Sequence, residues 1–183
     1  LCKELPTLEN GLVERETLPD GSEGLAITLE IHPEATWGDG TPVTTEDVAF
    51  TLEVGKHPQS GIANAEMYRR ILELRVHDEK RFTLLTDRVT FQYNVFADLR
   101  LLPAHVERAI FEADPESYRN RTAFDADPTN PALAWGPYRI VEVTPGAEIA
   151  LEPNPTWSGK PPAFDRIVVR AIVSGSRGCL HGD

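Results

Sequence analysis

The sequence of 183 residues is poor in basic side chains, in cysteine and in long apolar runs, and each shortage excludes a class of protein. Eighteen Lys and Arg against 29 Asp and Glu leave a net charge of −11, which argues against binding to nucleic acid or anionic lipid. The strongest apolar run, Ile167 to Val173, is interrupted by Arg170 and is far shorter than the roughly 20 residues of a transmembrane helix. Leu1 to Glu4 do not resemble a secretory signal, so either a signal was removed or these residues never stood at a native start.

Cysteine and histidine are too sparse and too scattered to indicate a metal centre. Cys2 and Cys179 stand near opposite ends of the chain, where two unrelated thiols are expected more than a disulfide suited to an oxidising compartment. The five histidines form no HExxH motif and no close pair, so the sequence predicts neither a metal nor a cofactor. His77 beside Asp78 lacks a nearby nucleophile, which favours a surface role over a catalytic one.

The remaining composition, 40% hydrophobic and 26% charged, is that of a folded globular chain of one large domain or two small ones. Alternating apolar and polar residues predict hairpins and a last strand, at 12–17 with 24–32, 72–76 with 81–87, 138–143 with 147–153, and 166–173. In the first hairpin, Leu25, Ile27, Leu29 and Ile31 are expected to face the core.

The clearest helix signal begins at Thr44. Thr44 is suited to an N-cap, Asp47 to the reciprocal side of a capping box, and Gly55 to the end of the helix. Further helices are expected from a cap at Asn64 to residue 70, over 90–101, and over 103–113 with Pro103 at the start. Residues 114–131 are predicted to form a long connection with one helical turn.

Four segments carry a family resemblance because they occur together and in order. They read WGDGTPVTTEDVAF at 37–50, LPAH at 102–105, WGPYRI at 135–140 and LEPNPTWSGKP at 151–161. Each resembles a motif of the family 5 extracellular solute-binding proteins of ABC transporters, the oligopeptide- and dipeptide-binding type. The resemblance covers 24–172, and members of the family are considerably longer than this chain.

The resemblance implies an α/β fold, specifically a fragment of a type II periplasmic-binding-protein fold with a mixed sheet, hairpins and short helices. We expect residues 1–131 to form an accessory subdomain of the first lobe and residues 132–173 to form part of the first ligand-binding lobe. Residues 174–183 are an atypical tail. The second lobe is expected to be absent from the fragment.

The implied function is solute binding for an ABC importer, with peptides or a related small solute held between two lobes and passed to an inner-membrane permease. The resemblance also implies a monomer that has no enzymatic activity and no cofactor. Such a protein is expected in the periplasm or outside the cell, and it could be lipid-anchored or free. Two alternatives are a structural or interaction module derived from this fold and, less expected, a hydrolase with an unrecognised site.

Three residues are candidates for ligand contact under this resemblance. Arg100 stands where some relatives place a cation for a ligand carboxylate, although a solvated surface role is more expected for it. Trp135 and Tyr138 flank a turn near the expected crossing between lobes, where ligand contact and core packing are equally expected. For Trp37, Asp39 and Gly40 a structural role is favoured, with Trp37 packed under the hairpin and the other two shaping its turn.

Overall fold

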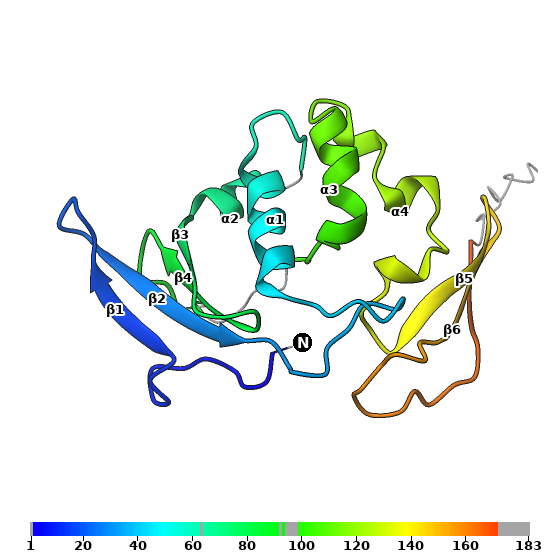
Figure 1. Ribbon diagram of the computed structural model, residues 1–183, viewed down its shortest axis with the longest axis horizontal. Helices are drawn as coiled ribbons and strands as arrows, with labels where there is room; N and C mark the ends of the chain where they lie inside the picture. The colour runs from blue at the N-terminus through cyan, green and yellow to red at the C-terminus, as the bar shows by residue number, and fades with distance from the viewer. Residues whose placement is uncertain (1, 63, 92, 94–98, 172–183) are drawn as a thin grey trace, which may run out of the picture.

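A computed structural model describes residues 2–62, 64–91, 93 and 99–171 of the chain (Figure 1). The elements are β1 (Val13–Thr17), β2 (Glu23–Glu30), α1 (Thr45–Lys56), α2 (Ala65–Arg69), β3 (Ile71–Val76), β4 (Arg81–Thr86), α3 (Ala104–Ala113), α4 (Ala123–Ala126), β5 (Tyr138–Thr144), β6 (Glu148–Pro153) and β7 (Ile167–Arg170). Two 3-10 turns, Tyr118–Asn120 and Pro131–Leu133, flank α4. Half of the helix predicted over 90–101 lies outside the described residues, and the described residues 90, 91, 93 and 99–101 are not helical.

The strands form two antiparallel sheets, one of order β1-β2-β4-β3 and one of order β5-β6-β7. Figure 1 shows the sheets at opposite ends of the molecule, with α1 and α3 between them. The α/β class with hairpins and short helices is therefore confirmed. The expected mixed sheet is corrected, because the described strands form two sheets in which every pairing is antiparallel. The predicted hairpins are confirmed within a residue or two at their ends.

Helix α1 is buried on two sides because its apolar residues lie on two faces of the helix. Val48 and Leu52 pack with the apolar face of β2 in one core cluster. Phe50 and Val54 pack with Phe111 of α3 in a second cluster. Complete burial of each such side chain stabilises the fold by about 1.5–3 kcal/mol. Helix α1 is therefore the element that joins the first sheet to α3.

The start of α1 is the predicted one, but its end differs. The capping box forms, with Thr44 accepting from the backbone N–H of Glu46 and Asp47 accepting from that of Thr44. The helix runs through Gly55 to Lys56, so the prediction that Gly55 ends it is wrong. A Cβ on Gly55 would lie 2.3 Å from the Tyr68 ring, and the glycine is explained by this close approach of α2.

Two smaller predictions are also corrected. Asn64 stands at the start of α2, but its side chain makes no capping hydrogen bond and its φ is 64°. In β3 the pairing register shifts between Ile71 and Glu73, so the predicted apolar alternation fails in part. Leu72 and Val76 are exposed, whereas Leu74 packs against the core.

The connection after α3 is more ordered than the sequence indicates. It contains α4 and both 3-10 turns instead of one helical turn. Glu107 and Tyr118 are completely buried there, and the Tyr118 hydroxyl donates to the Glu107 carboxylate at 2.9 Å. Glu107 also accepts from the backbone N–H of Ala123 at 3.0 Å, so one carboxylate joins α3 to the start of α4. Residues 172–183, with Cys179 and the predicted tail, lie outside the described residues.

Candidate functional site

The turn at Trp37 is held closed by its own backbone and by Asp39. The Trp37 N–H donates to the carbonyl of Thr41 at 2.8 Å, and the Asp39 carboxylate accepts from the N–H of Thr41 at 2.9 Å. Gly40 has a φ of 91°, a conformation that side chains with a Cβ rarely adopt. Trp37 itself is completely buried in the first core cluster. The structural roles predicted for Trp37, Asp39 and Gly40 are those observed.

Asp47 connects this turn to two helices. Its Oδ2 accepts from the indole N–H of Trp37 at 3.2 Å and from the backbone N–H of Thr44 at 2.9 Å. Its Oδ1 accepts from the backbone N–H of Ala104, the first residue of α3, at 2.9 Å. Asp47 is only 4% exposed, so these three donors replace water around a buried carboxylate. One side chain thus fixes the Trp37 turn, α1 and α3 together.

The other side of the turn contacts the segment just before the third motif and, through Thr156, the fourth motif. The Gly38 N–H donates to the carbonyl of Ala134, and a Cβ on Gly38 would lie 2.4 Å from the carbonyl oxygen of Pro131. The Thr156 hydroxyl donates to the carbonyl of Trp37 at 3.1 Å. Asn154, 4% exposed, donates through its side chain to the carbonyl of Gly136. We call the resulting contact region the Trp37 junction; it comprises Trp37, Gly38, Asp47, Ala104, His105, Ala134 and Thr156.

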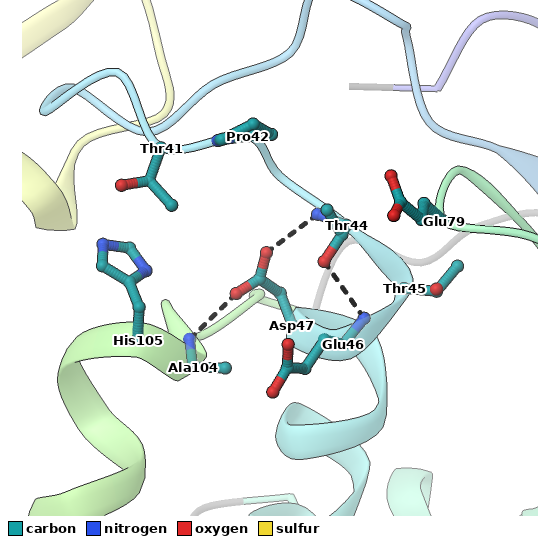
Figure 2. A pocket seen from close by; sticks show the side chains of 9 residues that line it. All are labelled: Thr41, Pro42, Thr44, Thr45, Glu46, Asp47, Glu79, Ala104 and His105. Carbon is teal, nitrogen blue, oxygen red and sulfur yellow. Dashed lines mark hydrogen bonds between the residues drawn. The ribbon is translucent and has the colours of Figure 1, made fainter.

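Beside the Trp37 junction lies an open hollow of about 400 Å³ between the start of α1 and the start of α3 (Figure 2). It is lined by Thr41, Pro42, Thr44, Thr45, Glu46, Asp47, Glu79, Ala104 and His105. Figure 2 shows Asp47 in the middle of the hollow's wall, accepting from Thr44 on one side and from Ala104 on the other.

The hollow has little to offer an anion. The N–H of Thr45 donates to the carbonyl of Glu79, that of Glu46 to Thr44, and that of Ala104 to Asp47. The carboxylates of Glu46 and Glu79 add negative charge to the lining. These three N–H groups at the two helix starts are therefore already bonded within the chain, and Asp47 uses one of them to hold the two helices together.

His105 and Asp39 form a histidine–carboxylate pair at this hollow, with 3.0 Å between Nε2 and Oδ2. Burial tends to raise the pKa of Asp39, but hydrogen bonds from Thr41 and His105 outweigh it and hold the pKa below its ordinary value. The His105 ring also lies against Trp37, with centroids 6.4 Å apart. Within the described ranges no serine, threonine or cysteine side chain hydrogen-bonds to this imidazole. The described residues also include no group of three His, Cys, Asp or Glu placed to hold a metal ion.

The structure places the three predicted ligand residues around two different segments. Arg100 is exposed and precedes α3. Trp135 is 37% exposed and follows Ala134, while Tyr138 begins β5 and accepts a hydrogen bond from the N–H of Phe164 at 2.9 Å. Across the described part of the chain, no hydrogen bond or cation–π contact joins Arg100 to either aromatic side chain. Their role in ligand binding stays a prediction.

Sequence reasoning does not identify Asp47 as the residue that links the motifs. The local pattern indicates a cap, which is correct, but Trp37 and Ala104 also use this carboxylate. Asn154 and Thr156 belong to the fourth motif, and the sequence assigns neither of them a role. The sequence offers one indication of these contacts, which is that the four motifs occur together in one chain. Motifs that occur together can lie in one contact region even when they are more than 100 residues apart in the sequence.

Comparison with solved structures defines the class of fold. The chain matches an oligopeptide-binding protein from Thermus thermophilus, solved with a pentapeptide, at a TM-score of 0.76 and 26% identity. The match covers 94% of this chain and 33% of that protein. The chain thus has the fold of part of a type II periplasmic binding protein.

The family follows from the sequence match. The model for bacterial extracellular solute-binding proteins, family 5 Middle, matches residues 7–178, and the chain belongs to this family. Peptidoglycan-binding protein YepA of Agrobacterium fabrum (strain C58) is 31% identical over 148 residues, which are 79% of this chain and 22% of YepA. "Probable peptide-binding protein YejA" of the same strain is 28% identical over 165 residues, 86% of this chain and 25% of YejA. The chain therefore spans about a quarter of the length of these relatives.

Proposed function

We propose that this chain is part of the solute-binding component of an ABC importer, which holds a peptide or a related small solute between two lobes and delivers it to an inner-membrane permease. The observation that carries the proposal is the family match over residues 7–178, which includes all four motifs. The oligopeptide-binding protein with its pentapeptide and the name of YejA support peptides as the class of solute.

The proposed activity consists of binding a solute and releasing it, and it requires no catalytic group. Closure of two lobes removes solute and cleft surface from water, and the solute stabilises the closed state by its differential affinity for that state. The Trp37 junction suits this work because it fixes the first sheet, α1, α3 and the β5 hairpin relative to one another. If the first lobe is rigid, the free energy of closing the two lobes is set by their contacts with the solute, because no free energy is spent on rearranging the lobe itself.

The proposal extends to organisation and location. Residues 1–131 are assigned to an accessory subdomain and residues 132–173 to part of the ligand-binding lobe. The protein is proposed to act as a monomer in the periplasm or outside the cell, which the family's description as extracellular supports. None of the helices in the described part of the chain combines the length and the apolar character that crossing a bilayer demands.

Arg100, Trp135 and Tyr138 are proposed as solute contacts. An exposed guanidinium such as that of Arg100 suits a peptide carboxylate, and the partly exposed ring of Trp135 suits an apolar side chain. Loss of a charge-assisted hydrogen bond costs about 1.5–3 kcal/mol, which corresponds to roughly a 10- to 100-fold loss of affinity.

Calorimetric titration of the full-length protein with a defined peptide library tests the proposal. We expect saturable binding that Arg100→Ala and Trp135→Ala weaken about tenfold or more. Arg81→Ala removes another exposed guanidinium, from β4 of the first sheet, and is the matched control that should leave affinity unchanged. Turnover of peptide or ester substrates would refute the proposal in favour of a hydrolase. Full affinity in every variant would refute only the assignment of the contacts.

A further inference from the structure

The β5-β6-β7 sheet has one face that is apolar over four successive cross-strand pairs, beyond which lies the pair Tyr138 with Pro153. Residues directly opposite each other in antiparallel strands share a face, and the pairs here are Ile140 with Leu151, Val143 with Ile149, Leu151 with Ile167, and Ile149 with Val169. A register shift between Ile140 and Glu142 keeps Val143 on the same side as Ile140. We call these residues the apolar sheet face: Ile140, Val143, Ile149, Leu151, Ile167 and Val169.

The opposite face carries Ala150 and Val168 together with charged residues, several of which form ion pairs with one another. Arg166 makes ion pairs with Glu142 at 2.9 Å and with Glu152 at 2.8 Å, and Arg170 pairs with Glu148 at 2.9 Å. All of these side chains keep at least 32% of their surface in water. The alternation of apolar and charged residues is that of a sheet with one face toward solvent and the other toward a core.

The apolar sheet face has no such core within the described ranges. Val169 is 56% exposed and Ile149 38%, and the other four residues are half-buried. Neither of the two core clusters includes a residue of β5, β6 or β7. A small sheet gains stability when its apolar face is packed against another layer, and a continuous exposed apolar face marks a contact surface.

We propose that the apolar sheet face is an interior surface of the ligand-binding lobe, covered by an apolar face from further polypeptide of the same solute-binding protein. The inference rests on the proposed function, in which this chain is one part of a longer protein. The matched relatives are about four times as long as the region they share with this chain, so they contain ample chain to supply such a cover. A second copy is the poorer occupant, because pairing would bring together two chains that each carry a net charge of −11.

Neighbouring valines on β7 provide a matched test. Val169 lies on the apolar sheet face, and Val168, 41% exposed here, pairs with Ala150 and lies on the charged face. In the full-length protein, Val169→Cys and Val168→Cys are labelled with a maleimide under native conditions, and labelling at each position is followed by peptide mass spectrometry. Cysteine is close to valine in size, so both variants are expected to fold. We expect the thiol introduced at position 169 to react about tenfold or more slowly than the thiol introduced at position 168.

Each outcome decides the inference. Slow labelling at position 169 alone, unchanged on dilution, supports the intramolecular cover. Equal rates at the two positions overturn it, and protection that disappears on dilution overturns it in favour of a second copy. Peptide titration of the same samples separates this inference from the proposed function. Binding with equal labelling rates sinks only the cover, whereas protection without binding of any solute sinks only the proposed function.

Discussion

Replacement of Asp47 by Asn is the sharpest test of the Trp37 junction. The substitution keeps the shape of the side chain but turns one acceptor oxygen into an N–H₂ donor. Oδ1 serves Ala104, and Oδ2 serves Thr44 and Trp37, so either orientation of the amide leaves at least one buried N–H facing another donor. The negative charge at the start of α1 is lost as well.

The magnitude follows from those contacts. A buried donor left without an acceptor costs about 1–3 kcal/mol. Removal of a charge near a helix N-terminus costs about 0.3–1 kcal/mol more. We therefore expect Asp47→Asn to lower the free energy of unfolding by about 1–4 kcal/mol. The matched control is Glu46→Gln, which removes a charge from the same helical turn at a side chain that is 71% exposed. Such an exposed pair contributes at most about 1 kcal/mol.

Urea unfolding of the full-length protein, followed by tryptophan fluorescence, measures both variants. The buried indole of Trp37 donates to Asp47, so its emission should change when the junction opens. An Asp47→Asn variant no less stable than Glu46→Gln would refute the view that this carboxylate holds the turn and the two helices together.

Further predictions concern Gly55 and Glu107. Gly55→Ala should lower the free energy of unfolding by about 1–3 kcal/mol, because the new Cβ overlaps the Tyr68 ring. This loss includes the opposing gain of about 1 kcal/mol by which alanine favours a helix relative to glycine. Unchanged or higher stability in urea would contradict this prediction. Burial raises the pKa of Glu107 above its ordinary 4.5, despite hydrogen bonds from Tyr118 and Ala123. The folded protein therefore binds this proton more tightly than the unfolded chain, and its stability relative to Glu107→Gln should fall as the pH rises from about 4.5 through the raised pKa. A pH-independent difference in unfolding free energy between wild type and Glu107→Gln would contradict this account.

Local structure is predictable where a short pattern determines it. The capping box at Thr44 and Asp47 and the core face of the first hairpin follow from side-chain chemistry within a few residues. The predictions at Gly55 and in β3 fail because their causes are tertiary. Tyr68 approaches Gly55 from another helix, and the register shift after Ile71 depends on pairing with β4.

The candidate site is predictable as a set of motifs but not as a geometry. Trp37 and Thr156 lie far apart in the chain, and nothing in either segment indicates that the Thr156 hydroxyl donates to the Trp37 carbonyl. Likewise, the capping bond to Thr44 already explains Asp47 from the local sequence. Its further bond to Ala104 depends on the packing of α1 against α3 and cannot be predicted from that sequence. The sequence therefore identifies the segments that form the candidate site but does not predict the contacts between them.

The central claim is that the protein containing this chain captures a small solute and releases it unchanged. Native mass spectrometry of the full-length protein, purified without denaturation and incubated with a mixed peptide pool, measures this directly. The account predicts an ion heavier than the bare protein by the mass of one solute, which is recovered chemically intact after unfolding. A bare protein ion at saturating peptide, or peptides returned as cleavage products, would contradict it.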